Sequence, residues 1–214
     1  LLTGCVWKGG DRMLYPLKPA EDMTPYRRFV GTWEGRIDKK TTAMVQLRYL
    51  AKHQMFHLDL TIFEDMETVF PSLIGTFSEI DDATYLCAML DVNALERDVK
   101  AAMGQRYSIS HLVIPPVLLA RIEPQPDDTI KISVLYFARR DDKGVFKSKI
   151  DAAMIYDDRA YLLLNSPDQI REFIHKQKYV LQELMTLRRK SPGPVKPASV
   201  VIEGVRNDPR YSIH

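Results

Sequence analysis

The chain of 214 residues is poor in cysteine, in long apolar runs and in net charge. Its two cysteines allow at most one disulfide, and neither begins a C-x-x-C or C-x-x-H spacing typical of metal or redox sites. No run of about 18 apolar residues is present that could form a membrane-spanning helix. The 30 basic and 28 acidic side chains leave a formal net charge of +2. This balance does not indicate a nucleic-acid-binding surface, so we expect no nucleic-acid partner.

Motifs of catalysis are also missing from the chain. It contains no G-x-S-x-G nucleophile elbow and no glycine-rich phosphate loop, and the neighbours Ser110 and His111 do not by themselves make a triad. His53 and His57 lie four residues apart, which on a strand separates them by about 13 Å. We interpret them as polar residues on a solvated face rather than as a metal pair. We therefore expect no catalytic residue, no metal and no cofactor, with a hydrolase as a minor alternative.

What the sequence does contain is alternation of apolar and polar residues, the pattern of half-buried strands. Nine segments show strand character: Trp33–Asp38, Val45–Tyr49, Met55–Phe63, Ser72–Ile80, Thr84–Leu90, Val117–Glu123, Ile130–Tyr136, Val145–Ile155 and Ala160–Leu164. Four aspartate pairs fall between strands, at 81–82, 127–128, 141–142 and 157–158. Aspartate tolerates tight turns, and no pair has the ligand order of a calcium loop, so we interpret the pairs as hairpin turns. The pattern predicts a mainly β fold, α+β at the margin, built as an antiparallel barrel or meander.

Three helical segments accompany the strands. Thr24–Phe29 has a threonine N-cap and a first-turn proline, which predicts a short α or 3₁₀ helix. The spacing of apolar residues in Asn93–Met103 predicts a short helical insert that could cover one end of the sheet. Ser166-Pro167-Asp168-Gln169 forms a capping box, and apolar residues then recur at helical spacing as far as Leu187. This predicts a long C-terminal helix that ends near Lys190 and packs against the sheet.

Leu2-Thr3-Gly4-Cys5 resembles the lipobox of bacterial lipoproteins, in which a lipid transferase and a signal peptidase recognise the cysteine. The resemblance implies that residues 1–5 are the end of a signal peptide with its lipidated cysteine, Cys5. Residues 6–23, with Gly9-Gly10, Pro16 and Pro19, then read as a flexible spacer. Position 6, directly after the cysteine, is valine and not the aspartate that is associated with inner-membrane retention in some bacteria. We therefore expect a protein anchored in the bacterial cell envelope and facing the periplasm, with the outer membrane favoured.

Gly31-Thr32-Trp33, directly after the predicted short helix, resembles the G-x-W signature of the first strand of lipocalins and their calycin relatives. The resemblance implies a barrel over residues 24–190, closed at one end by Trp33. In this family an arginine near the last strand packs over the tryptophan, and Arg159 in Tyr156-Asp157-Asp158-Arg159 is the candidate here. Residues 191–214 would be a proline-rich tail, in which 199–202 could be an edge strand or disordered.

Two functions remain open from the sequence. The first is a non-enzymatic, lipid-anchored barrel whose interior binds a small apolar ligand, such as a lipid or fatty acid. The second is a structural lipoprotein with a filled core that meets an envelope protein partner. A cavity of several hundred Å³ would separate them. The residues expected to line the ligand site are the apolar members of two strands: Phe56, Leu58, Leu60, Ile132, Val134 and Tyr136.

Overall fold

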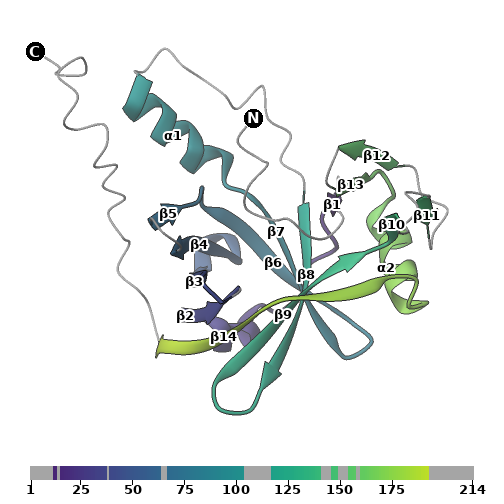
Figure 1. The fold of residues 1–214 in the computed structure, drawn as a ribbon, viewed down its shortest axis with the longest axis horizontal. Coiled ribbons are helices and arrows are strands. Elements are labelled where there is room, and N and C mark those ends of the chain that lie inside the picture. Colours follow the sequence, from purple (N-terminus) through teal and green to yellow (C-terminus); the bar gives the residue numbers. More distant parts are fainter. Residues whose placement is uncertain are drawn as a thin grey trace, which may run out of the picture.

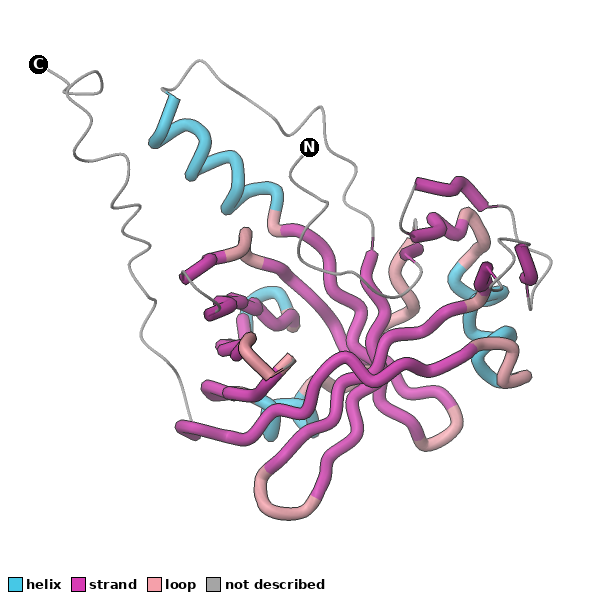
Figure 2. Tube along the Cα trace, viewed as in Figure 1, coloured by secondary structure: helices cyan, strands magenta, loops and turns pink. Residues whose placement is uncertain are grey.

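Eight strands form a closed antiparallel barrel in the computed structural model, which describes residues 12–13, 15–37, 39–63, 67–103, 117–140, 146–148, 154–157 and 160–192. Strands make up most of the described residues, and the two α-helices among them lie outside the barrel wall (Figure 2). The barrel strands are β2 (Gly31–Arg36), β3 (Thr42–Leu50), β4 (Met55–Phe63), β6 (Leu73–Ile80), β7 (Ala83–Leu90), β8 (Val117–Gln125), β9 (Thr129–Tyr136) and β14 (Val180–Pro192).

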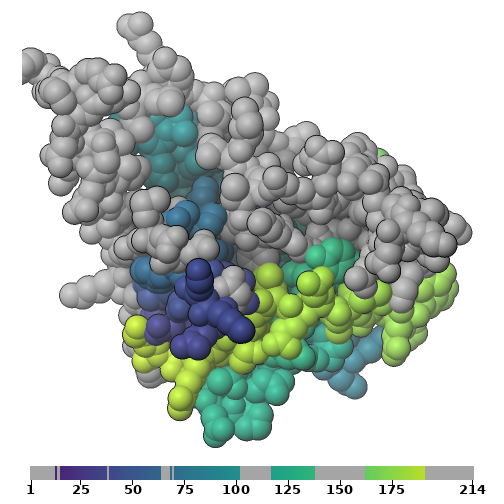
Figure 3. Space-filling model, in the orientation of Figure 1, coloured from purple at the N-terminus to yellow at the C-terminus, as the bar shows by residue number. Residues whose placement is uncertain are grey.

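The barrel is a meander, because each of these strands pairs antiparallel with the next one along the chain. The ring closes where β14 pairs with β9 on one side and with β2 on the other. In Figure 3, β14 crosses the visible face between the purple N-terminal strands and the β8–β9 hairpin. A Cβ on Gly35 of β2 would lie 2.1 Å from the Thr186 carbonyl oxygen, so glycine permits the close approach of β2 and β14 at this seam. The short β5 (Glu67–Val69) lies beside β4.

Two of the four aspartate pairs form hairpin turns, as predicted. Asp81 and Asp82 join β6 to β7 with φ of 50° and 63°, and Asp127 and Asp128 join β8 to β9 with φ of 60° and 56°. Two consecutive residues in the left-handed region are typical of the tightest hairpin turns, where aspartate is tolerated. Asp141 and Asp142 lie outside the described residues, as does Asp158, whereas Asp157 ends a strand.

An insert between β9 and β14 lies against the outside of the barrel. It contains β10 (Ala138–Arg140), β11 (Phe146–Ser148), β12 (Met154–Asp157), β13 (Ala160–Leu163) and α2 (Pro167–His175). Ile170 and Ile174 of α2 are buried in a second apolar cluster with outward-facing residues of β7, β8 and β9. The insert and α1 (Val92–Met103) flank the barrel on opposite sides (Figure 1).

The predicted long C-terminal helix is wrong beyond its first half. The capping box of Ser166 and Gln169 is present and starts α2, but the helix ends at His175. Gln177 adopts a left-handed conformation (φ 52°), and the chain then continues as β14, the strand that closes the barrel. A β-bulge between Glu183 and Met185 interrupts the two-residue alternation of β14, and this irregularity allowed the strand to resemble a helix in sequence.

The described part of the predicted spacer is packed rather than free. β1 (Arg12–Met13) pairs parallel with β13 and antiparallel with β8. Residues 15–23, which we call the N-terminal strap, lie on the barrel wall, with Leu17 and Met23 almost fully buried. The Ser78 hydroxyl donates to the Lys18 carbonyl (2.8 Å), and the Ala20 N–H donates to the Phe77 carbonyl (2.8 Å). Among the described residues, no helix is long and apolar enough to cross a membrane.

Candidate functional site

One end of the barrel is closed by the 3₁₀ helix η1 (Thr24–Phe29) and by Trp33 at the start of β2. The Trp33 indole N–H donates to the Phe29 carbonyl (2.7 Å), which ties the strand to the helix that precedes it. Tyr26 and Phe29 both stack on Phe77 of β6, with ring centroids 4.8 and 5.2 Å apart. Burial raises the pKa of Tyr26 to about 12, with a further contribution from Glu79. An aromatic layer therefore seals this end, which we call the closed end.

Arg189 of β14 covers the closed end from outside. It is the register partner of Trp33, and its guanidinium carbon lies 4.2 Å from the centroid of the tryptophan ring. The guanidinium donates to the carbonyls of Val30 (2.8 Å) and Arg28, at the end of η1. It also pairs with Asp128 in the β8–β9 turn (3.4 Å). One side chain thus joins η1, β2, β14 and a hairpin turn. Arg159, the arginine that the sequence suggested for this role, lies outside the described residues.

The six residues expected to line a ligand site all lie on the inward face of the barrel. Phe56, Leu58 and Leu60 alternate along β4, and Ile132 belongs to the same interior cluster. Val134 and Tyr136 follow Ile132 at two-residue intervals on β9, and Val134 pairs with the inward-facing Ala120. The strand faces expected from the alternation agree with the structure, and the ligand-lining role of the six residues stays a prediction. Their alternation with outward residues made this predictable.

On β4 and β6, the inward side chains farthest from the closed end are the most exposed. Along β4, Phe56 is 0% exposed, Leu58 8% and Leu60 6%, and Ile62 is only partly buried. Leu73 at the start of β6 is likewise partly buried, whereas Phe77 near the end of the same strand is 1% exposed. Alanines instead of large side chains face inward at positions 43, 88 and 120. On these two strands the inward side chains are thus fully buried near the closed end and partly exposed, but still apolar, at the opposite end, which we call the mouth.

A polar cluster lies on the outer wall of the barrel, formed by Arg48, His57, Asp59, Ser72 and Asp91. His57 and Asp59 are the outward residues of β4, and register pairs His57 with Arg48 of β3. An Arg48 nitrogen lies 2.9 Å from His57 Nδ1 and also bonds Asp59. His57 Nε2 lies 3.8 Å from Asp91, whose other oxygen accepts from the Ala94 N–H at the start of α1 (3.0 Å). Sequence analysis assigned His57 to a solvated face and did not predict this cluster.

The cluster holds Asp59 as a carboxylate. Burial raises its pKa, but hydrogen bonds from His57 and Ser72 and the charges of His57 and Arg48 outweigh burial and lower the pKa to about 2. The Ser72 hydroxyl donates to Asp59 Oδ1 (2.6 Å). A serine bound to so acidic a carboxylate has no base to take its proton, so this arrangement differs from a nucleophilic triad. The side chains of the cluster instead link β3, β4 and the start of α1.

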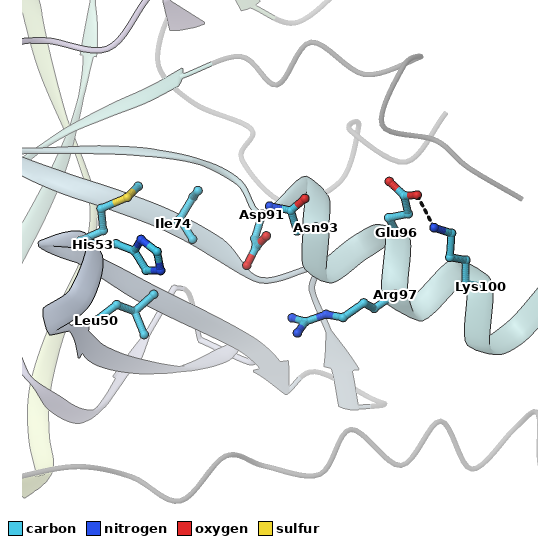
Figure 4. Close-up of a pocket in the computed structure, with 9 residues that line it drawn as sticks. Leu50, His53, Ile74, Asp91, Asn93, Glu96, Arg97 and Lys100 are labelled. Atoms are coloured by element: carbon cyan, nitrogen blue, oxygen red, sulfur yellow. Dashed lines mark ion pairs between the residues drawn. The ribbon is translucent and has the colours of Figure 1, made fainter. Parts of the chain in front are cut away.

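A cavity of about 550 Å³ lies next to this cluster, between the outer wall and α1. Figure 4 shows Leu50, His53 and Ile74 on its barrel side, and Arg97 extending from α1 toward them. Glu96 and Lys100 of α1 form an ion pair (2.6 Å) along the same helix. The predicted insert therefore borders a groove on the wall. His53 is the last residue of η2 (Ala51–His53), the short 3₁₀ helix between β3 and β4.

Several sequence-based expectations lie outside the described residues, including the lipobox with Cys5 and the segment 199–202. In the part of the chain that the structure describes, no group of three or more His, Cys, Asp or Glu side chains is placed to hold a metal ion. The functional residues that sequence analysis missed are Arg189 and the polar cluster. Arg189 and Trp33 lie 156 positions apart along the chain, and only closure of the barrel brings them together. No local sequence pattern therefore indicated Arg189.

Replacing Arg189 by alanine removes the cation from the Trp33 ring and leaves the carbonyls of Val30 and Arg28 without this donor. We expect the free energy of unfolding to fall by about 2–3 kcal/mol, as for other hydrogen-bonded charged groups. Arg189→Lys should restore little, because an ammonium cannot bond two carbonyls and stack in the same geometry. Arg188→Ala is the control, since Arg188 is the exposed neighbour on β14. Urea denaturation followed by tryptophan fluorescence measures the difference, and equal losses for both alanine variants would contradict this role.

The low pKa of Asp59 predicts a pH dependence of stability. Its pKa in the folded protein, about 2, lies below the ordinary value of 3.8. The carboxylate therefore stabilises the fold above about pH 4, and this contribution, about 2 kcal/mol, is lost as the pH falls toward 2. Asp59→Asn should flatten the change in unfolding free energy between about pH 4 and pH 2, whereas Asp98→Asn on the exposed face of α1 should not. Identical pH profiles for the two variants would show that the cluster does not depend on this charge.

Comparisons with protein-family models, curated proteins and solved structures find no significant match to this chain. The geometry of the barrel and its wall is therefore the basis for assigning a function.

Proposed function

We propose that this protein is a non-enzymatic, membrane-anchored bacterial envelope lipoprotein whose calycin-like barrel holds a small apolar molecule, such as a lipid or fatty acid. The observation that carries the proposal is the difference in side-chain exposure between the two ends of β4 and β6 inside the barrel. Aromatic rings fill the closed end, whereas partly exposed aliphatic side chains, including Ile62 and Leu73, line the mouth. An apolar barrel interior whose side chains are partly exposed at one end is suited to burying an acyl chain.

Three features of the barrel support the calycin part of the proposal. A 3₁₀ helix leads directly into the strand that carries Gly31-Thr32-Trp33, eight strands follow one another as a closed meander, and an arginine of the last barrel strand packs on the tryptophan. Eight-stranded up-and-down barrels are the architecture of lipocalins. One feature departs from the resemblance, because α2 precedes the last barrel strand instead of following it.

The ligand is tested by native mass spectrometry of the full chain carrying Cys5→Ser, purified from a bacterial host and measured before and after denaturation. This substitution prevents acylation of Cys5 from being mistaken for bound ligand. We expect a co-purified, lipid-like mass at one per chain. A clean unliganded mass, together with no thermal stabilisation by added fatty acids, would contradict the carrier function. It would favour the alternative, an interaction lipoprotein with a filled core.

A matched pair of variants locates the binding site. Ile62 faces the barrel interior at the mouth, and its neighbour Thr61 faces outward on the same strand. Ile62→Trp should obstruct the mouth and weaken binding of a fluorescent fatty acid by about tenfold or more, which corresponds to roughly 1.4 kcal/mol. Thr61→Trp should bind as the unmodified protein does. Equal affinities in the two variants would place any ligand outside the barrel.

The membrane anchor is a separate part of the proposal and rests on the motif Leu2-Thr3-Gly4-Cys5. A lipidated cysteine with more than one acyl chain gives stable anchoring, because each buried CH₂ contributes about 0.8 kcal/mol. Expressed in bacteria behind a lipoprotein signal sequence, the protein should incorporate labelled palmitate and sediment with the envelope fraction, and Cys5→Ser should lose both properties. Cys87→Ser is the control. Labelling that persists in the Cys5 variant would refute anchoring through this residue.

A further inference from the structure

A second cavity on the outer wall, of about 410 Å³, is lined by an unusual set of donor atoms. Five of its lining residues carry a sulfur atom or an imidazole: Met23, Met55, Met89, Cys87 and His53. Among the residues that the structure describes, no carboxylate and no lysine or arginine lines this cavity. Thioethers, thiolates and imidazoles are ligands for soft metal ions, whereas calcium, magnesium and manganese prefer oxygen.

The strand register explains why these side chains share one space. Cys87 of β7 is paired with Thr76 of β6, and both face outward. Phe56 is paired with Gly75, so Met55 lies beside Thr76 on the other flank of β6. Met89 lies two residues beyond Cys87 on the same face. Because adjacent strands are about 4.8 Å apart and alternate residues about 7 Å apart, the three backbone positions lie within roughly 12 Å of one another.

The side chains at these positions favour convergence of the sulfur atoms. The outward residue of the middle strand, Thr76, is small, which leaves space above that strand. Methionine has three rotatable bonds, and this flexibility lets the Met55 and Met89 thioethers reach a common centre. His53, exposed in the turn before β4, marks the side on which the cavity opens.

The N-terminal strap covers the other side of the cavity. Pro16, Pro19 and Ala20 line it, and hydrogen bonds from Ser78 to Lys18 and from Ala20 to Phe77 fix the strap on β6. Cys87 beneath it is 1% exposed, and burial raises the pKa of its thiol to about 11. The thiol therefore keeps its proton in the free protein, and a bound soft cation would displace that proton to solvent as the Cys87 sulfur becomes a ligand.

We propose that this cavity binds one Cu(I) ion through the sulfur atoms of Met55, Met89 and Cys87, with His53 at the entrance. The site is independent of the proposed apolar ligand, because it lies on the outer face of β4, β6 and β7 while the ligand would lie inside the barrel. Its donor set favours Cu(I) over Zn²⁺, since only two of the described residues that line it, His53 and Cys87, are common zinc ligands.

The test is an anaerobic titration of the full chain carrying Cys5→Ser, which leaves Cys87 as the one remaining cysteine. Cu(I), kept reduced by ascorbate, is offered in competition with a chromophoric Cu(I) chelator. We expect one equivalent to be retained by the protein, and Zn²⁺ offered in its place to bind far more weakly. Failure of the protein to retain Cu(I) against a weak chelator would overturn the proposal.

Variants that keep the volume of the side chains separate metal binding from packing. The double substitution Met55→Leu and Met89→Leu removes two thioethers while preserving apolar bulk, so the fold should persist. We expect it to weaken Cu(I) binding at least tenfold, whereas Met185→Leu, in the barrel interior, should not change the affinity. Unaltered affinity in the double variant would show that these methionines serve packing alone.

A spectroscopic measurement covers the case in which a variant does not fold. In the unsubstituted protein with ¹³C-labelled methionine methyl groups, one equivalent of Cu(I) should shift the resonances of Met55 and Met89 and leave that of Met185 in place. Shifts confined to other methionines would place the metal elsewhere and refute the site.

Discussion

The pairing of β14 with both β2 and β9 is the constraint on which the rest of the structure depends. Without it, the meander would be an open sheet with two edges of unpaired N–H and C=O groups. Closure also brings Arg189 to Trp33 and thereby positions η1 over the end of the barrel. The interior becomes an enclosed apolar space only because this seam is shut, so the proposed ligand site, the aromatic layer and the close approach at Gly35 are consequences of one strand pairing.

Much of the wall could be predicted from the sequence, because a strand with one face in the core alternates with a period of two. Met55–Phe63 was assigned with the bounds that the structure has, and the outward positions of the same strand became the polar cluster. β14 could not be predicted in this way. Its bulge shifts the register between Glu183 and Met185, so that Leu181, Leu184 and Leu187 fall three apart and imitate one face of a helix. Propensity and capping were correct for α2, but neither indicates where a helix ends.

The candidate sites differ in how well they could be predicted from the sequence. The six inward residues of β4 and β9 share strand faces, and local alternation is sufficient to group them. Arg189, by contrast, acts through contacts with residues near position 30, and the polar cluster joins His57 to Arg48 and Asp91 through register and through the start of α1. The sulfur-lined cavity depends on three strands and the strap at once. Such long-range groupings require the topology to be known first.

The packing of the N-terminal segment against the barrel limits how far the barrel can lie from the proposed membrane anchor. Arg12 and Met13 are already paired with β8 and β13, and the strap continues along the wall. If Cys5 carries lipid, the six residues 6–11 are the whole length of chain between the bilayer surface and the barrel, which even fully extended reaches only about 25 Å. The short linker would then keep the protein close to the membrane. It could exchange an apolar molecule with that bilayer but could not reach across the periplasm to the other membrane.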